Sequence, residues 1–201
     1  MSKVKPNRTS PSLDMTPLVD LAFLLVTFFM LTTKFAPDDP VIVDMPSSVS
    51  EIKLPETDIM TITVAPDGRV FFGIDGQFTK QRLIQNIGQK YGVTFSPEEE
   101  RAFYLASSMG MPVRSMKQFL SMEPAQRKTI QQPGIPVDSA NNELADWVVY
   151  ARVANPKVRI AIKGDREANY PTVAKVISTL QDKKVNRFNL ITNMEAAPAK
   201  Q

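Results

Sequence analysis

One carboxylate stands inside the most apolar stretch of the chain. From Pro17 to Phe35 only Asp20 and Lys34 carry a charge. A carboxylate that faces lipid costs about 2.5–3.5 kcal/mol, so such a residue normally faces other helices or a water-filled cavity and marks an ion or proton pathway. The chain has no histidine and no cysteine. Asp20 is therefore the ionisable group best placed to bind and release a proton.

A helix through this stretch would place two threonines on the same face as Asp20. At about 100° per residue, Thr16 lies one turn before the aspartate and Thr27 two turns after it. We expect Thr27 to bond the acid or to hold a water beside it, with Thr16 supporting the same face. One alternative stays open for Asp20: it is near the helix start and would cap the helix or extend towards lipid headgroups. Asp14 is nearer the interface, and we interpret it as a cap of the helix.

The composition excludes several kinds of chemistry. Without cysteine or histidine the chain has no thiolate nucleophile, disulfide, zinc–thiolate site or imidazole base. The net charge of +3 comes from scattered Lys and Arg rather than from a basic run, which argues against a nucleic-acid partner. The acidic run Glu98–Glu100 is explained by a helix start. We therefore expect no enzyme activity, no cofactor, no metal and no small-molecule substrate.

The apolar stretch is long enough for a membrane-spanning helix. As a helix, Pro17–Phe35 would extend about 28 Å, close to the bilayer hydrocarbon thickness of about 30 Å. We expect a transmembrane helix over residues 15–35 that starts at Thr16 and Pro17, with the proline at the first helical position. A cleaved signal peptide and a buried core helix are the alternatives.

Basic residues mark the orientation of this helix. Lys3, Lys5 and Arg8 precede it, whereas an acidic linker follows it. The positive-inside rule then places residues 1–14 in the cytoplasm. The C-terminal part of the chain would lie across the membrane, in the periplasm of a bacterium that has two membranes.

The stretch DMTPLVDLAFLLVTFFMLTT, residues 14–33, resembles the signature of the ExbD/TolR family of biopolymer-transport proteins. That signature is an Asp-x-Thr-Pro-x-x-Asp lead into an apolar helix that ends in residues similar to Phe-Met-Leu-Thr-Thr. The second aspartate of the signature carries protons in the family, and it falls on Asp20. The resemblance thus implies a proton-carrying role for this residue.

The resemblance also implies a stator subunit of an inner-membrane proton-channel motor. A homodimer of the single helix would sit inside a ring of an ExbB- or TolQ-like partner. Energy from the proton flow would pass to a TonB- or TolA-like protein, for outer-membrane transport or for envelope maintenance, and both duties stay open. The alternative is a passive membrane-tethered module that binds cell wall or a protein partner in the periplasm without conducting protons.

Residues 36–57 are typical of a linker, rich in proline and acidic residues. Within them VIVDMP, residues 41–46, resembles a short apolar segment of the family, with methionine in the position of leucine. The resemblance implies a plug that blocks the motor at rest. The candidate plug residues are Val41, Val43, Met45 and Pro46. An ordinary edge strand is the alternative.

Alternating apolar residues predict a two-layer α+β periplasmic domain built from residues 58–92 and 156–195, followed by a tail, residues 196–201. The pattern predicts, in order, a hairpin around Pro66-Asp67-Gly68, a helix over 80–91 capped by Thr79, a strand over 158–162, a helix over 171–182 and a strand over 188–192. Asp165 and Tyr170 match the C-terminal pattern of the family. We interpret Asp165 first as a turn residue.

Residues 93–155 depart from the family, in which the next strand follows the first helix within a few residues. They predict an inserted helical subdomain. Ser96, Pro97 and Glu99 form a capping box with proline at the first helical position, and Gly110 should end that helix.

Further helices of the insertion are predicted within residues 112–122, 124–132 and 141–155. The last of them carries an apolar stripe of Leu144, Trp147, Val148 and Ala151. The insertion is also rich in methionine, namely Met109, Met111, Met116 and Met122. These side chains either fill the core or form an adaptable docking surface for a further partner.

Overall fold

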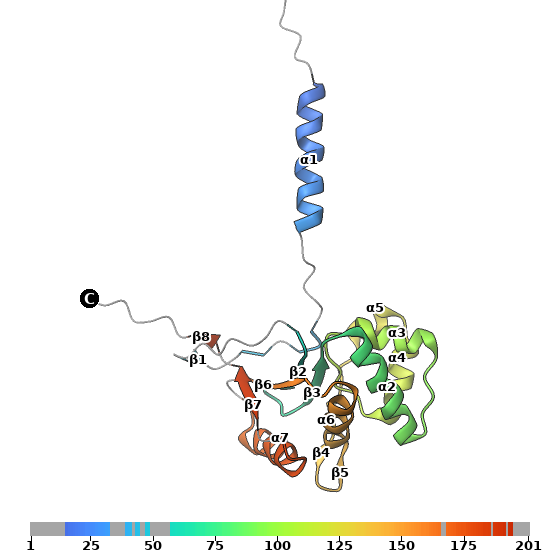
Figure 1. Cartoon of the computed structure of the whole chain (residues 1–201), viewed down its shortest axis with the longest axis vertical. Helices are drawn as coiled ribbons and strands as arrows, with labels where there is room; N and C mark the ends of the chain where they lie inside the picture. Colours follow the sequence, from blue (N-terminus) through green and yellow to red (C-terminus); the bar gives the residue numbers. More distant parts are fainter. Residues whose placement is uncertain are drawn as a thin grey trace, which may run out of the picture. The chain divides into compact units, whose positions relative to one another are not determined.

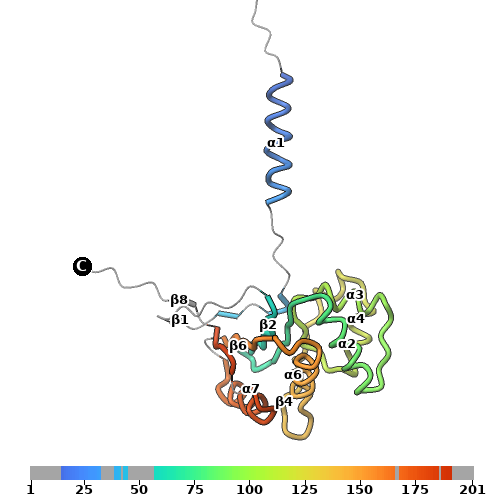
Figure 2. The backbone as a smooth tube through the Cα atoms, in the orientation of Figure 1, coloured from blue at the N-terminus to red at the C-terminus, as the bar shows by residue number. Residues whose placement is uncertain are grey.

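The structure, a computed structural model, describes residues 15–32, 39–41, 43–44, 47–48, 57–165, 168–185, 187–191 and 193–194. Outside them lie the predicted cytoplasmic segment 1–14, the end of the predicted transmembrane helix at 33–35, most of the linker and the tail 196–201. The chain divides into two compact units, Met1–Ala36 and Pro37–Gln201. The first contains a single described helix, and the second contains all the described strands (Figures 1 and 2).

Helix α1 spans Thr16–Thr32, 17 residues. The Met15 carbonyl accepts its first hydrogen bond from the Val19 N–H at 3.0 Å. Pro17 lies in the first turn, where a missing N–H leaves no helical bond unmade. At about 1.5 Å per residue the helix is about 26 Å long, shorter than the span predicted over residues 15–35. Among the described residues, no helix combines the length and the apolar character needed to cross a membrane.

A four-stranded sheet in the order β3-β2-β6-β7 forms the centre of the second unit. Its strands are β2 (Ile59–Val64), β3 (Val70–Ile74), β6 (Arg159–Gly164) and β7 (Phe188–Ile191). Strand β2 pairs antiparallel with β3 and parallel with β6, and β6 pairs parallel with β7. The predicted hairpin and the two later strands are confirmed. Two short pairs lie apart from this sheet: β1 (Ser47–Ser48) with β8 (Asn193–Met194), and β4 (Val137–Asp138) with β5 (Asn141–Asn142).

The turn between β2 and β3 uses the predicted Pro66-Asp67-Gly68 sequence. The Ala65 carbonyl accepts the Gly68 N–H at 3.0 Å, and the Arg69 carbonyl accepts the Ala65 N–H at 2.9 Å. Gly68 has a φ of 83°, a backbone region that glycine adopts at no steric cost. This is the geometry of a three-residue hairpin loop closed by a glycine bulge. It fixes the register that puts the apolar residues of both strands on one face.

Three helices pack on this apolar face of the sheet: α2 (Gln77–Tyr91), α6 (Glu143–Ala154) and α7 (Tyr170–Asp182) (Figure 1). The strands contribute Met60, Ile62, Val64, Val70, Phe72, Ile160 and Ile162 to the core. The helices contribute Leu83, Ile84, Ile87, Leu144, Trp147, Val148, Val176 and Leu180. The predicted two-layer α+β architecture is confirmed, because the helices bury the side that the alternation marks as apolar.

Helix α2 begins earlier than predicted. Strand β3 ends at Ile74, so only Asp75 and Gly76 connect it to the helix. Gly76 takes the N-cap position with a φ of 89° and no side chain caps the helix. The prediction that Thr79 caps it is therefore wrong, because the short connection starts the helix at Gln77 and places Thr79 inside the first turn.

The segment between α2 and β6 is helical, as predicted. Before α6 it forms α3 (Pro97–Leu105), α4 (Val113–Ser121) and α5 (Pro124–Thr129). At the start of α3 the Ser96 hydroxyl accepts the Glu99 N–H at 3.2 Å, and the Glu99 carboxylate accepts the Ser96 N–H at 2.8 Å. The predicted capping box is thus confirmed. The helix ends at Leu105, however, and not at Gly110.

Gly110 instead lies against the sheet. A Cβ on Gly110 would come within 2.4 Å of the Phe71 ring, so a larger residue would push the ring away. The preceding residue, Met109, pairs with Phe72 through two backbone hydrogen bonds of 2.8 and 2.7 Å. The glycine therefore allows the insertion to run close along the outer edge of β3. This contact, and not the end of a helix, explains why a glycine occupies position 110.

The insertion is not a separate subdomain. Trp147 of α6 is fully buried. Its ring centroid lies 5.3 Å from that of Phe72 in β3 and 6.0 Å from that of Phe103 in α3. One hydrophobic cluster thus runs from the sheet through α6 into the inserted helices. The prediction of a subdomain over residues 93–155 is wrong in this respect, because the inserted helices complete the core of a single unit.

The methionines of the insertion belong mostly to this core. Met109, Met111 and Met116 are 2%, 9% and 0% exposed, and only Met122 is half-buried. Flexible, unbranched side chains fill irregular gaps between short helices well. The core-filling interpretation is confirmed for the first three, which leaves them no surface with which to dock a partner.

Candidate functional site

Asp20 is the single ionisable residue of α1, and every side chain of that helix is exposed. Thr16 is the first residue of the helix, and it lines the same side of the helix surface as Asp20 and Phe23. Within the described part of the chain, no group hydrogen-bonds or ion-pairs with the Asp20 carboxylate. The acid is therefore presented outward, to whatever surrounds the helix.

Thr27 lies on the predicted face but does not bond Asp20. Its hydroxyl donates to the carbonyls of Phe23 at 2.9 Å and Leu24 at 3.0 Å. Thr32 likewise donates to the carbonyl four residues before it at 2.8 Å. The two hydroxyls are satisfied by their own helix, so they can enter apolar surroundings without an outside partner. The expected contact between Thr27 and the acid is corrected accordingly.

A second carboxylate, Asp165, fixes the linker to the α+β domain. Asp165 follows β6 and is only 9% exposed, and its Oδ2 accepts the backbone N–H of Asp44 at 2.7 Å. The Asp165 N–H donates to the Val64 carbonyl, and its carbonyl accepts from the Ala168 N–H, both at 3.1 Å. The interpretation as a turn residue is right for the backbone. It misses the side chain, which holds a segment 121 positions away in the sequence.

The candidate plug residues lie in the segment that Asp165 holds. Val43 is buried, with 7% exposure, and Val41 is half-buried. Met45 and Pro46 lie outside the described residues. Among the described residues of the linker, the buried side chain of Val43 and the hydrogen bond to the Asp165 carboxylate fasten it to the domain. A hydrogen bond to a carboxylate is stronger than one between neutral groups.

Tyr170 matches the same C-terminal pattern as Asp165 but sits in a different setting. It is the first residue of α7, directly before Pro171, and its side chain is 80% exposed. An aromatic ring this exposed adds little to the packing of the domain. Tyr170 is therefore available for contact with another molecule, whereas Asp165 is occupied within the chain.

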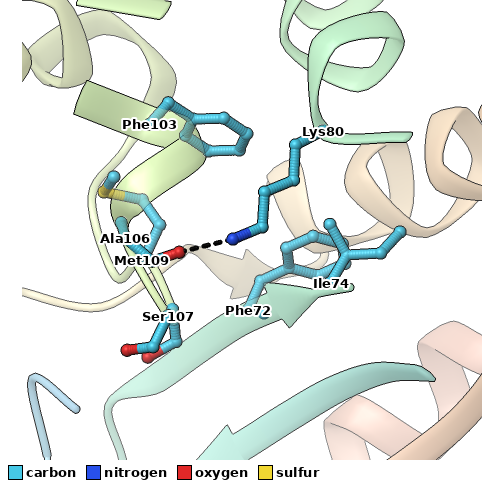
Figure 3. A pocket seen from close by; sticks show the side chains of 9 residues that line it. Phe72, Ile74, Lys80, Phe103, Ala106, Ser107 and Met109 are labelled. Carbon is cyan, nitrogen blue, oxygen red and sulfur yellow. Dashed lines mark hydrogen bonds between the residues drawn. The ribbon is translucent and has the colours of Figure 1, made fainter. Parts of the chain in front are cut away.

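Lys80 of α2 holds the end of α3 (Figure 3). Its Nζ donates to the carbonyls of Tyr104 at 3.0 Å and Ala106 at 2.7 Å. The last carbonyls of a helix lack helical partners and favour a cation. Burial lowers the pKa of Lys80, and the negative charge of Asp75 opposes that shift. The adjoining cavity of about 10 Å³ holds one water at most, so Lys80 is a structural cap that no sequence pattern indicates.

The family model described as biopolymer transport protein ExbD/TolR matches residues 6–195. The chain belongs to the ExbD/TolR family. The match runs across the insertion, so the family assignment covers α1, the linker and the α+β domain alike. No curated protein and no solved structure matches the chain.

Membership of the ExbD/TolR family implies a stator-type role in biopolymer transport. In this ExbD/TolR chain the structure places two carboxylates in opposite settings. Asp20 is exposed on an apolar helix. Asp165 is buried and bonded to the linker, where it can hold or release a segment. Asp20 was identified from residue type and surroundings, whereas the contact of Asp165 with the linker is seen only in the fold.

Proposed function

We propose that this chain is the proton-carrying subunit of an inner-membrane motor for biopolymer transport, with Asp20 as the group that takes up and releases the proton. The observation that carries the proposal is a helix with one ionisable residue and no buried side chain. A helix that is apolar on all sides is stable when other helices or lipid cover it. An ionisable residue on such a helix normally lines a polar path.

The anchor in this proposal is the apolar run from Pro17 to Phe35, which contains α1. A helix somewhat shorter than the hydrocarbon thickness is accommodated by local thinning of the bilayer and by long flanking side chains. Lys34 can extend its ammonium group to the headgroups in this way. Lys3, Lys5 and Arg8 favour a cytoplasmic N-terminus and a periplasmic α+β domain.

The proposed partners follow from the state of Asp20. An outward-facing carboxylate that no described group pairs with needs polar surroundings from another chain when the helix is buried. We infer an ExbB- or TolQ-like ring subunit around a homodimer of α1. A TonB- or TolA-like protein would receive the energy, for outer-membrane transport or for envelope maintenance.

The linker supplies a resting state in this proposal. The bond from the Asp44 N–H to Asp165 would hold the segment around Val43 against the domain, and its release would free the segment. Asp165→Ala should raise the hydrogen-exchange rate of the Asp44 amide by about tenfold or more, because a hydrogen bond to a charged group contributes about 1.5–3 kcal/mol. Asp182→Ala, at an exposed position of α7, should leave that rate unchanged.

The decisive test of the motor is Asp20→Asn, which keeps the shape of the side chain and removes its ionisation. The chain and its ring subunit would be reconstituted in liposomes, with proton flux read by a trapped pH-sensitive dye. We expect flux to fall to background while the two proteins still co-purify. Asp14→Asn is the matched control, and there we expect flux close to the unaltered level.

Normal flux in the Asp20→Asn protein would refute the motor proposal. It would favour the alternative, a passive tethered module that binds cell wall or a protein partner. Co-purification of the intact membrane complex also distinguishes the two duties, because a TonB-like partner indicates outer-membrane uptake and a TolA-like partner indicates envelope maintenance.

A further inference from the structure

A groove of about 490 Å³ lies on the surface of the second unit. Its walls come from α3, α4 and α5 and from the loop that follows α3. Asp39 and Pro40 of the linker border it. Almost all of its lining thus belongs to residues 93–155, the segment that departs from the family pattern. The proposed proton path uses none of these residues.

The groove presents aliphatic side chains that the fold leaves uncovered. Leu105, the last residue of α3, is 78% exposed, and Ile130, just after α5, is 37% exposed. Phe119 of α4 also lines the groove but is 5% exposed. Single exposed aliphatic residues are common on proteins. Two of them beside a buried aromatic ring, in one hollow, form a surface that can take up an apolar side chain.

Arg127 adds a guanidinium group to the lining of this groove. Its Nε is buried and has no hydrogen-bond partner in the described part of the chain. A buried N–H without an acceptor is unfavourable, and more so when the group is charged. The guanidinium fork of arginine matches the two oxygens of a carboxylate. Arg127 lines the groove, so a carboxylate that enters the groove would lie against a cation with which it can pair.

The charges around the groove point to the same ligand. Its basic residues are Arg127 and Lys128, neighbours on α5, and its one acidic lining residue is Asp39 of the linker. The dipeptide Asp39-Pro40 of the chain itself therefore already borders the groove. The guanidinium charge of Arg127 in this lining favours an acidic segment over a basic one.

We propose that this groove binds an extended segment of a partner protein that carries an aliphatic side chain next to an aspartate or glutamate. The aliphatic side chain lies on Leu105 and Ile130, and the carboxylate accepts hydrogen bonds from Arg127. The site does not depend on proton flow. The Asp20→Asn protein therefore binds such segments as the unaltered chain does, which separates this proposal from the motor proposal.

The ligand chemistry can be tested with a random peptide library selected on the immobilised full-length chain in detergent micelles. We expect selected peptides to be enriched in Asp or Glu beside Leu or Ile. The same selection on the Arg127→Gln protein should lose the acidic preference. Selection on Arg152→Gln, which removes an exposed arginine of α6 outside the groove, should retain it.

Affinities of one selected peptide then test the two halves of the site. Arg127→Gln should weaken binding by about tenfold or more, the effect of losing a charge-assisted bond. Replacing the peptide's acid by its amide should weaken binding of the unaltered chain by a similar factor and change the affinity of the variant little. Leu105→Ser should also weaken binding, whereas Leu190→Ser on the 46% exposed Leu190 of β7 should not.

Three outcomes would overturn the proposal. One is a selection without acidic enrichment, and another is equal affinity of the Arg127→Gln and unaltered proteins. The third is occupation of the groove by a second copy of this chain or by its own C-terminal tail. A thiol-reactive crosslinker attached to the Leu105→Cys protein would detect this occupation in the absence of peptide. A crosslinked dimer that survives reduction would indicate a second copy, and a crosslink within one chain would indicate the C-terminal tail.

Discussion

Helices α1 and α6 are both apolar and both carry a carboxylate near their N-terminal end, but they differ in how far their side chains are buried. In α6 seven side chains are buried, and Glu143 among them is 4% exposed. The Glu143 carboxylate accepts the Val113 N–H at 2.8 Å, at the start of α4. In α1 no side chain is buried, and no described group meets Asp20.

We propose that the difference separates a structural carboxylate, Glu143, from a functional one, Asp20. A carboxylate that accepts hydrogen bonds inside its own domain stabilises a particular fold. Glu143 does so by accepting the N–H of Val113, which has no partner within its own helix. An acid on an apolar helix that no group of its own chain binds normally faces other helices or a water-filled cavity. Mutations in α6 should therefore change stability, and mutations in α1 should change activity.

The largest effect on stability is expected for Trp147→Ala. The residue is fully buried between Phe72 and Phe103, and such truncations lower the free energy of unfolding by about 3–5 kcal/mol. Denaturant unfolding monitored by far-UV circular dichroism would measure the loss. Phe23→Ala in α1, at a position 67% exposed, should change it by less than about 0.5 kcal/mol. Similar losses for the two variants would remove the contrast between the helices.

A smaller loss is expected for Glu143→Ala. The Val113 N–H would lose its acceptor in a buried place, which costs about 1–3 kcal/mol. The same unfolding measurement applies. Glu143→Gln keeps a carbonyl oxygen in position and should recover part of the loss. Equal stability of the alanine and glutamine variants would show that the hydrogen bond to Val113 does not account for the contribution of Glu143 to stability.

The second acid of α6, Asp146, gives a pH test. The Tyr91 hydroxyl donates to it at 2.8 Å, and burial, followed by that bond, raises the pKa of Tyr91 well above its usual range. Unfolded chains would ionise this phenol near its ordinary pKa of about 10, while the folded state keeps it neutral. Its stabilisation is therefore complete below about pH 10 and is lost as the pH rises towards the folded pKa.

Tyr91→Phe measures this contribution. The unfolding free energy of the unaltered chain should fall more steeply above about pH 10 than that of the variant. Tyr104 and Lys80 also have shifted pKa values, but they are present in both proteins and cancel in the difference. Parallel pH curves for the two proteins would show that the bond between Tyr91 and Asp146 does not favour the neutral phenol.

The smallest effect on stability is expected for Asp20→Asn. No described group bonds this side chain, so the unfolding free energy of the α+β domain should stay within about 0.5 kcal/mol. The same substitution should abolish proton flux. A variant that loses both stability and flux would mean that Asp20, like Glu143, has a structural partner.

Much of the fold follows from the sequence, because local periods and caps carry the information. The alternation around Met60 and Val70 predicts the hairpin, and the spacing of Ser96 and Glu99 predicts the capping box at α3. The elements that pack against an apolar stripe cannot be predicted from a local sequence pattern. The stripe through Trp147 is visible in the sequence, but its place between β3 and α3 is not, which is why the insertion reads as a subdomain of its own.

The candidate sites divide in the same way. Asp20 is identifiable because its residue type conflicts with its immediate neighbours. Asp165 is not, since its acceptor role joins it to Asp44, 121 positions away. Arg127 is likewise ordinary in sequence, and its burial and its place in the groove lining are seen only in the fold. The prediction for Gly110 fails for a related reason, since its contact with the Phe71 ring decides its role. The prediction for Thr79 fails because the two-residue connection after β3 starts the helix earlier.

The pairing of Met109 with Phe72 has a consequence for assembly. An open strand edge is a template on which another chain can add a strand. The insertion occupies the outer edge of β3, with Ile135 also donating its N–H to the Val70 carbonyl at 2.8 Å. Within the described residues, this sheet can then be extended only past β7. Copies joined edge to edge through β7 would close as a pair and could not grow into an open-ended filament.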